Sequence, residues 1–183
     1  THEAIDPIRY LTNRSTGTMG YALATAAVRA GAKVTLISGP TSLAPPPSVE
    51  LIAVQSAVEM SQAVLARIDN ADVFIAAAAV ADYRPDKVAQ QKIKKTAESM
   101  TLSLVPNPDI VRQVTQRVKR PFTVGFAAET EEVLAHASAK LHDKNLDMMI
   151  ANRVGADIGF GDSDHAAIAL SKESGQLDFP VQP

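Results

Sequence analysis

The chain has no cysteine among its 183 residues, and aromatic residues make up only 4% of it. Without cysteine there can be no disulfide framework, no thiolate nucleophile and no zinc site built on cysteine, which fits a reducing cytoplasm. Few aromatic side chains leave few platforms on which the bases of single-stranded nucleic acid could stack. The core must therefore consist of Ala, Val, Ile and Leu, within an ordinary hydrophobic content of 46%.

Neither sign of charge dominates, since 18 basic and 20 acidic residues leave a formal net charge of −2. The chain therefore lacks the basic field that draws proteins to nucleic acid. No apolar run approaches the roughly 20 residues that span a bilayer, and no signal-peptide pattern opens the chain. The 4 histidines show no HExxH or other metal spacing. We expect a cytoplasmic protein that binds neither nucleic acid nor membrane and holds no metal through its own side chains.

Apolar strand-like segments alternate with helical segments along most of the chain. Strands are expected at 33–38, 49–54, 72–79, 101–105, 122–126 and 146–152, and helices at 18–30, from Ser56 through Ile68, at 109–119 and at 131–143. This order predicts an α/β fold, a Rossmann-like doubly wound and mostly parallel sheet with helices on both faces. The length favours a single domain over residues 1–183.

Two further features complete the predicted fold. The tail from Val154 is broken by glycines around "AAIALS" and is expected to form loops and a small C-terminal edge hairpin; these glycines are Gly155, Gly159, Gly161 and Gly175. The chain opens on the polar segment "THEAIDP", whereas an α/β domain usually opens on a buried strand. We therefore expect the first strand upstream of Thr1.

Ligands of such sheets bind beyond the carboxyl ends of the strands, so the segments after strands are the candidate sites. The first is "NRSTGTMG", residues 13–20, where Gly17 and Gly20 flank the start of a helix whose N–H groups favour anions. It is neither a Walker loop nor a GxGxxG loop. A plain helix start with close packing at Gly20 is the alternative, and neither interpretation requires Asn13.

Two more segments carry candidate chemistry. In "AAAAVADYRP", residues 76–85, small side chains would let a ligand approach the backbone, with the Asp82 carboxylate at the rim; a buried strand whose Asp82 caps a turn is the alternative. The basic stretch "KIKK", residues 92–95, lies in a long loop of the kind that often forms a lid. Its lysine could neutralise a phosphate or carboxylate during reaction, although such charge runs are more often merely solvated.

Three weaker candidates follow. The backbone of "PNPDIV", residues 106–111, could line a pocket, although Asp109 as a helix cap explains the segment equally well. Phe126 could stack on a flat ring or belong to the core. Lys140 and Lys144, four residues apart on a helix, could face a polyphosphate or only water.

Taken in order, these segments resemble the phosphopantothenoylcysteine synthetase family. The likeness rests on "DPIRYLTNRSTGTMGYALA", "AAAVADYRP", "KIKK", "NPDIV", "VGFAAET" and "KNLDMMIAN", runs from Glu3 to Asn152, and resumes weakly at "GFGDSDHAAIAL". In many bacteria this synthetase is the carboxy-terminal half of a bifunctional coenzyme A biosynthesis protein. The resemblance implies fusion to a flavin-dependent decarboxylase domain and no flavin in the domain seen here.

The resemblance also implies a reaction. The carboxylate of 4′-phosphopantothenate attacks the α-phosphorus of CTP and releases pyrophosphate; the amine of L-cysteine then attacks the acyl cytidylate, giving the amide and CMP. Mg²⁺ accompanies the triphosphate. The family is a homodimer that shares its substrate site between subunits, so the same assembly is expected here.

The same resemblance implies residue roles. Asn13 would hold the acyl intermediate and orient it for cysteine, and Lys92 would be the lid lysine that stabilises charge at the carboxyl and α-phosphate. The nucleotide would be bound by Ala76, Ala77, Ala78, Asp82, Lys92, Pro108, Asp109, Ile110, Val111, Phe126, Lys140 and Lys144. The substrate and its phosphate would be bound by Asn13, Ser15, Gly17, Ala79 and Asp82. Thr16 and Thr18 replace a serine and a lysine that the family commonly has, which would weaken phosphate contacts.

Three alternatives remain. One is the same ligase using ATP, as eukaryotic relatives do. Another is a dinucleotide-binding oxidoreductase domain, which the lack of GxGxxG and of an acidic residue at the end of "KVTLIS" speaks against. The last is a non-catalytic nucleotide-binding module, which a Lys92→Gln variant would separate from the ligase.

Overall fold

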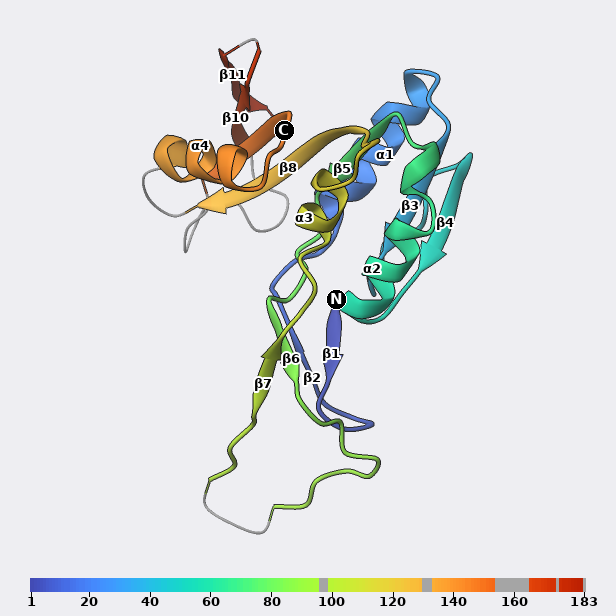
Figure 1. Ribbon diagram of the computed structural model, residues 1–183. Helices are drawn as coiled ribbons and strands as arrows, with labels where there is room; N and C mark the ends of the chain where they lie inside the picture. The colour runs from blue at the N-terminus through green and yellow to red at the C-terminus, as the bar shows by residue number, and fades with distance from the viewer. Residues whose placement is uncertain (96–98, 130–132, 154–164, 174, 183) are drawn as a thin grey trace. The chain divides into compact units, whose positions relative to one another are not determined.

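The structure is a computed structural model, and it describes residues 1–95, 99–129, 133–153, 165–173 and 175–182. By their contacts these residues form two compact units, each described by itself below (Figure 1). The first unit comprises Thr1–Val64 and Ala78–Asp109, and the second comprises Leu65–Ala77 and Ile110–Pro183. The prediction of a single domain stays a prediction.

The first unit combines one parallel strand pair with two short antiparallel ribbons (Figure 1). Its elements are β1 (His2–Ala4), β2 (Tyr10–Thr12), α1 (Thr18–Arg29), β3 (Val34–Ser38), β4 (Val49–Ala53), α2 (Ala57–Leu65), β6 (Tyr83–Pro85) and β7 (Leu104–Pro106). Strands β3 and β4 pair in parallel. Strands β1 and β2 form the β1–β2 ribbon, and β6 and β7 form the β6–β7 ribbon, both antiparallel.

The helices of the first unit begin where the sequence supplies helix-start residues. Gly17, with φ +84°, precedes α1 in a left-handed conformation that glycine adopts readily. At α2 the Glu59 N–H donates to Ser56 Oγ at 3.2 Å, and the Gln55 N–H donates to the Glu59 carboxylate at 2.9 Å. These bonds satisfy helix-start N–H groups, much as in the capping box that the Ser56–Glu59 spacing predicts.

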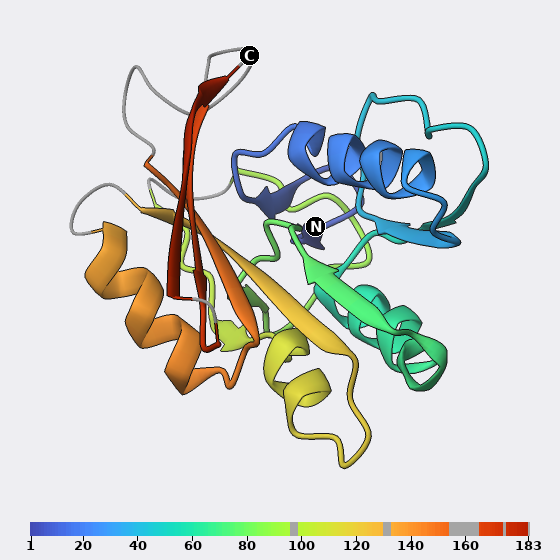
Figure 2. The same ribbon diagram turned by 90° about the horizontal axis from the view of Figure 1, so that it is seen from above.

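The second unit is built on a five-stranded sheet of order β11-β10-β9-β8-β5 (Figures 1 and 2). Its elements are η1, a 3₁₀ turn (Ile68–Asn70), β5 (Val73–Ala76), α3 (Ile110–Thr115), β8 (Phe122–Glu129), α4 (Val133–Asp143), β9 (Met148–Arg153), β10 (His165–Ser171) and β11 (Gly175–Gln182). Strands β5, β8 and β9 are parallel, and β10 and β11 add antiparallel to the edge beside β9.

The core of the second unit lies between α4 and the centre of this sheet (Figure 2). It is formed by Ala127, Ala137, Leu141, Leu146, Met149 and Ala151. Gly125 of β8 lies directly against it, because a Cβ added there would be 2.7 Å from Leu146 Cδ1 and 3.2 Å from Met149 Cε. Leu146 is 0% exposed, so a shift of its side chain would disturb the packing around it. The close approach therefore requires glycine at this position.

Several element boundaries differ from the predictions. Helix α2 ends at Leu65 and Ile68 lies in η1, because Arg67 leaves helical geometry with φ −124°. The strand expected over 72–79 ends at Ala76, after which the Val80 N–H bonds back to the Ala78 carbonyl in a tight turn.

Two further boundaries were wrong near α3. The strand expected at 101–105 is β7 at Leu104–Pro106. The helix expected over 109–119 is α3 at Ile110–Thr115, because the following turn tightens at an Arg117 N–H to Val114 carbonyl bond. Among the glycines expected to break the tail, Gly155, Gly159 and Gly161 lie outside the described residues.

Candidate functional site

Asn13 follows β2 and lies against residues 78–82, the part of the first unit that comes after β5 in the sequence. Its side-chain Nδ2 donates to the Val80 carbonyl at 3.1 Å. The side chain is exposed, and its Oδ1 has no hydrogen-bond partner among the described residues. An amide both donates and accepts, so the donor half fixes Asn13 while the acceptor half stays available to a ligand.

A second asparagine, Asn107 after β7, holds the same segment. Its Nδ2 donates to the Ala81 carbonyl at 2.9 Å, and its backbone N–H donates to the Asp82 carbonyl at 2.7 Å. Arg84 fixes this asparagine in turn, with Nη1 donating to Asn107 Oδ1 at 3.2 Å. Two amide side chains therefore hold Val80 and Ala81, which lie between the predicted pocket residues Ala79 and Asp82. The Asp82 carboxylate is exposed.

Sequence reasoning missed Asn107 and Arg84, although both lie in segments it quoted, "PNPDIV" and "AVADYRP". The available signal was that an asparagine directly follows two separate short strands, as Asn13 and Asn107 do. Their common partner segment could not be read from spacing.

The segment before α1 is arranged as an open helix start. Thr16 Oγ1 and Thr18 Oγ1 share a hydrogen bond of 2.7 Å, and the Thr41 hydroxyl donates to the Thr16 carbonyl at 2.8 Å. The N-cap, Gly17, offers no side-chain cap. The exposed Ser15 lies beside it, with Oγ 3.4 Å from the Gly17 N. This arrangement suits an anion at the helix start.

Close packing does not explain Gly20. A Cβ built on Gly20 meets nothing within 4 Å among the described residues. The alternative of close packing at this position was therefore wrong for the structure described here. Space beside a helix start is what an approaching anion would need.

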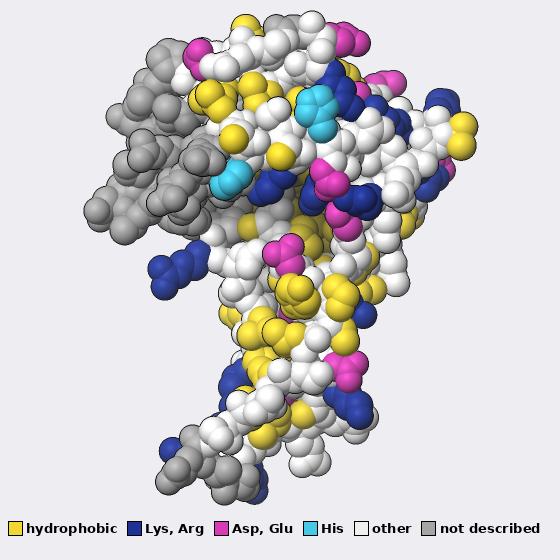
Figure 3. Space-filling model, turned by 60° about the vertical axis from the view of Figure 1, so that its left-hand side comes forward, with side chains coloured by type: hydrophobic (Ala, Val, Ile, Leu, Met, Phe, Trp, Pro, Cys, Tyr) yellow, Lys and Arg dark blue, Asp and Glu magenta, His cyan; other side chains and the backbone are white. Residues whose placement is uncertain are grey.

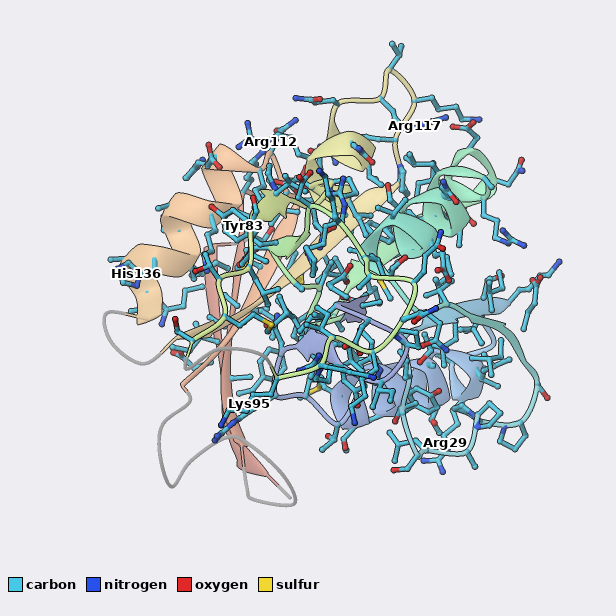
Figure 4. All side chains as sticks on the ribbon, turned by 90° about the horizontal axis from the view of Figure 1, so that it is seen from below. Arg29, Tyr83, Lys95, Arg112, Arg117 and His136 are labelled. Atoms are coloured by element: carbon cyan, nitrogen blue, oxygen red, sulfur yellow. The ribbon has the colours of Figure 1, made fainter. Side chains whose placement is uncertain are left out.

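Lys92 lies in the loop between β6 and β7, where Lys95 of the same basic stretch is also found (Figure 4). Lys92 is exposed and has no ion pair or hydrogen bond within the described ranges. The next residue, Ile93, donates its N–H to Asp6 Oδ2 at 3.1 Å and accepts from Arg9 Nη2 at 3.0 Å. The Lys92 ammonium is thus without a partner in the described residues, whereas the backbone of the next residue, Ile93, is held by Asp6 and Arg9.

Asp6 is the carboxylate that accepts the bonds from both Ile93 and Arg9. Its side chain is 0% exposed. Hydrogen bonds from Arg9 lower the pKa of the Asp6 carboxyl well below its usual range, and the N–H groups of Ile8, Arg9 and Ile93 act in the same direction against the opposing effect of burial. Asp6 therefore carries its charge at neutral pH.

The remaining predicted residues are distributed over both units. In the first unit, Ala78 and Asp109 are exposed, while Ala79 and Pro108 are half-buried. The others belong to the second unit and are Ala76, Ala77, Ile110, Val111, Phe126, Lys140 and Lys144.

Packing limits what some second-unit residues can offer a ligand. Ile110 is buried and Val111 packs against the α4 core, so these two would present backbone rather than side chain. Phe126 of β8 is half-buried, as are Ala76 and Ala77 at the end of β5. Lys140 lies on α4 and is exposed, and Lys144 follows one turn later with its N–H bonded to the Lys140 carbonyl at 3.0 Å.

The described residues contain neither a cluster of metal-ligand side chains nor a helix that could cross a membrane. Across the described ranges, no three His, Asp or Glu side chains converge as the ligands of a metal ion would. In the same part of the chain, no helix combines the length and apolarity needed to cross a bilayer.

Comparison with known proteins gives matches over the full chain. Residues 1–183 match the family model described as DNA/pantothenate metabolism flavoprotein C-terminal domain. The coenzyme A biosynthesis bifunctional protein CoaBC of Vibrio parahaemolyticus is 55% identical over 186 residues, which is 100% of this chain and 46% of that protein. The protein of the same name from Escherichia coli is 46% identical with the same coverage. The chain thus spans about half the length of these curated relatives.

A solved structure gives the corresponding match in three dimensions. The crystal structure of the C-terminal domain of a CoaBC protein matches with a TM-score of 0.84 at 37% identity, covering 100% of this chain and 83% of that one. This confirms the predicted α/β fold with a mostly parallel central sheet.

Proposed function

The chain belongs to the DNA/pantothenate metabolism flavoprotein C-terminal domain family, and on that premise we propose that it is a phosphopantothenate–cysteine ligase domain of coenzyme A biosynthesis. The observation that carries this proposal is the Asn13 side chain, fixed to the Val80 carbonyl at 3.1 Å with its oxygen open to a ligand. An amide held in this way orients a reacting group without itself reacting.

The proposed reaction has two steps, activation of the carboxylate and formation of the amide. A carboxylate oxygen of 4′-phosphopantothenate bonds to the α-phosphorus of CTP while the bond to pyrophosphate breaks. The amine of L-cysteine then bonds to the acyl carbon, CMP leaves with the former carboxylate oxygen, and one proton is released from the nitrogen. The products are 4′-phosphopantothenoylcysteine, CMP and pyrophosphate.

Asn13 and Lys92 act on different parts of this sequence. Asn13 holds the acyl cytidylate, and its open Oδ1 accepts a hydrogen bond from the attacking amine. Lys92 stabilises the negative charge that develops at the carboxyl and the α-phosphate. The exposed position of Lys92, without a protein anion paired to it in the described residues, supports this role.

Phosphate groups are assigned to the helix start. Ser15 and Gly17 meet the phosphate of the substrate at the first turn of α1, where N–H groups and the helix dipole favour an anion. The paired hydroxyls of Thr16 and Thr18 stand where the family commonly has a serine and a lysine, so we expect a weaker phosphate contact here.

The nucleotide is assigned to the segments after β5, β7 and β8. Asp82 accepts hydrogen bonds from the hydroxyl groups or base edge of cytidine, and the small side chains of Ala76–Ala79 allow close approach. Pro108 to Val111 and Phe126 surround the cytidine. Lys140 and Lys144 face the triphosphate, with which Mg²⁺ travels.

A homodimer is part of the proposal. Large apolar side chains are exposed on and beside the two ribbons of the first unit, where hydrophobic side chains gather on the surface (Figure 3). They are Ile8, Tyr10, Tyr83, Val88, Met100 and Leu104. Homodimer interfaces are richer in apolar surface than the rest of a protein, so a second copy is the expected cover.

The wider context is likewise proposed. Because the chain spans about half of its curated relatives, we propose that it is fused in the full protein to a flavin-dependent decarboxylase domain and binds no flavin itself. We place the protein in the cytoplasm, where nucleoside triphosphates such as CTP are available.

The test measures CMP, pyrophosphate and amide product in the presence of Mg²⁺, with each substrate omitted in turn. We expect CMP formation to require both 4′-phosphopantothenate and CTP, and amide formation to require cysteine as well. Pyrophosphate release that is independent of 4′-phosphopantothenate would contradict the proposal. Competition between CTP and ATP decides the nucleotide, and preference for ATP would favour the alternative ligase of the eukaryotic type.

A further inference from the structure

The turn between β1 and β2 is closed by its own residues. The Ile5 N–H donates to the Arg9 carbonyl at 2.8 Å, and the N–H groups of Ile8 and Arg9 both donate to Asp6 Oδ1 at 2.9 Å. Asp6 followed by Pro7 is a common way to start a tight turn, because the carboxylate accepts local N–H groups and proline fixes φ. The backbone N–H groups of the turn use only Oδ1 of the Asp6 carboxylate.

The other half of the Asp6 carboxylate faces a distant segment. Asp6 Oδ2 accepts from Arg9 Nε at 3.0 Å, from Arg9 Nη2 at 2.6 Å and from the Ile93 N–H at 3.1 Å. Arg9 Nη2 also donates to the Ile93 carbonyl at 3.0 Å. One ion pair therefore binds both backbone polar groups of a single residue 84 positions away from Arg9.

A second contact ties the same loop to the same turn. The Ala89 N–H donates to the Ile5 carbonyl at 3.0 Å. Bonds that involve an ionised partner are roughly twice as strong as neutral ones. We call the contacts of Asp6 and Arg9 with Ile93 the Ile93 clamp.

We propose that Asp6 and Arg9 are positioning residues for Lys92, which they hold in place through the Ile93 clamp. The inference rests on the proposed function, in which Lys92 acts on the carboxyl and α-phosphate. The loop between β6 and β7 has little regular structure around Lys92, and an unanchored loop would have to be ordered in every catalytic cycle. Fixing the backbone at Ile93 restricts the positions that Lys92 can reach, so less of its freedom remains to be removed when the substrate binds.

Two variants break the clamp in different ways. In Asp6→Asn, the amide oxygen can still accept the N–H groups of the local turn. The amide nitrogen then takes the place of Oδ2 and faces the Arg9 guanidinium and the Ile93 N–H. All of these groups are donors, so the bonds to Arg9 and Ile93 are lost. In Arg9→Lys, the charge remains, but a single ammonium cannot reproduce the guanidinium fork on the carboxylate and the Ile93 carbonyl. Arg9→Lys leaves Asp6 in its turn, so it still tests the clamp if Asp6→Asn fails to fold.

The first readout is hydrogen exchange at the Ile93 amide in the protein without substrates. We expect a protected amide in the wild type and at least tenfold faster exchange in both variants. The matched control is Asp69→Asn, which removes an exposed ion pair with Arg117 and should leave Ile93 unchanged. Equal exchange of Ile93 in wild type and clamp variants overturns the proposal.

The second readout separates positioning from general damage. We expect each clamp variant to lower kcat for CMP formation about tenfold or more, with the KM for CTP changed less than threefold. In a Lys92→Gln background, followed with radiolabelled CTP, the same substitutions should cost no further activity. A loss of kcat that persists in the Lys92→Gln background overturns the proposal. Failure of the proposed function is distinguishable, because the wild type itself would then form no CMP.

Discussion

At the scale of single residues, the segment after β5 is held by two amide side chains. Asn13 bonds to the Val80 carbonyl at 3.1 Å and Asn107 bonds to the Ala81 carbonyl at 2.9 Å. Backbone carbonyls that could otherwise face water are thereby fixed toward the protein. The two asparagines differ in one respect, because Asn107 Oδ1 is engaged by Arg84 and Asn13 Oδ1 has no partner in the described residues. Of the two amide oxygens, that of Asn13 is therefore the more available to a reacting group.

Substitution of Asn13 by Asp tests that difference. The carboxylate cannot donate to the Val80 carbonyl and adds a negative charge near the phosphates, so we expect CMP formation to fall by about 10²-fold or more, the loss typical of a positioned polar group. The fold should be retained, because Asn13 is exposed. The control is Asn70→Asp, because Asn70 is another exposed asparagine and lies in η1 of the second unit. Wild-type turnover in Asn13→Asp would show that this amide plays no part in the reaction.

Substitution by alanine should have opposite effects on the free energy of unfolding at Gly125 and at Gly20. Gly125→Ala would place a methyl group 2.7 Å from Leu146 Cδ1, and we expect it to lower the free energy of unfolding by about 1–3 kcal/mol through overpacking. Gly20→Ala meets nothing within 4 Å and lies in α1, so we expect it to be neutral or to stabilise by up to about 1 kcal/mol. Urea denaturation of both variants provides the measurement. A loss in Gly20→Ala equal to that in Gly125→Ala would contradict the packing described here.

At the scale of elements, Asp147 ties the start of β8 to the connection between α4 and β9. Its Oδ1 accepts from Arg120 Nη2 at 2.8 Å and its Oδ2 accepts from the Thr123 N–H at 2.7 Å. The Asp147 N–H donates to the Thr123 carbonyl at 3.0 Å. Burial alone would raise the pKa of the Asp147 carboxyl, but the bonds from Arg120 and Thr123 outweigh it and lower that pKa below its usual value.

The lowered pKa of Asp147 predicts how the stability of the protein depends on pH. A carboxyl whose pKa is lower in the folded protein stabilises it above the unfolded pKa of about 3.9, and this stabilisation is lost as the pH falls through the folded pKa. We expect Asp147→Asn to be less stable than wild type by about 1–3 kcal/mol at pH 7, and the gap to shrink below pH 4. Urea denaturation at pH 7 and pH 3 measures it.

The exposed pair of Asp143 and Arg112 supplies the comparison. Asp143→Asn should change the free energy of unfolding by no more than about 1 kcal/mol at either pH, as is usual for surface ion pairs. If the gap between wild type and Asp147→Asn stayed constant from pH 7 to pH 3, the charge of Asp147 would not be the source of its contribution.

The elements also show what the sequence could predict. Long apolar strands such as β8 and β9, and the alanine-rich α1, are found near their predicted places because periodicity alone identifies them. The three-residue strands β1, β2 and β6 were not predicted, since they are too short for an alternating pattern to be recognised. The site follows the same division. Asn13 and Lys92 were named from the family resemblance, whereas the bond between Asp6 and Ile93 joins residues 87 positions apart and no spacing rule predicts it.

At the scale of the whole molecule, the homodimer proposed from the family resemblance is supported by the apolar side chains exposed on the ribbons. Tyr83, on β6, is 55% exposed, and Leu104, on β7, is 44% exposed. A double substitution of both by Glu would place charge in the proposed interface. We expect the wild type to sediment as a dimer, and the double variant to sediment as a monomer with reduced CMP formation.

Val118 serves as the control, because it is a fully exposed apolar residue of the second unit, outside both ribbons. Val118→Glu should leave sedimentation and activity unchanged. A wild type that is fully active as a monomer would contradict a site shared between subunits.

The central claim is that the carboxylate of 4′-phosphopantothenate is activated by direct attack on the α-phosphorus. The decisive measurement uses substrate labelled with ¹⁸O in that carboxylate and follows the label by mass spectrometry after turnover with CTP and cysteine. The proposed reaction predicts one ¹⁸O atom in each CMP and none in pyrophosphate. Unlabelled CMP together with amide product would show that the carboxylate is activated in another way, and would contradict the acyl cytidylate that Asn13 and Lys92 are proposed to serve.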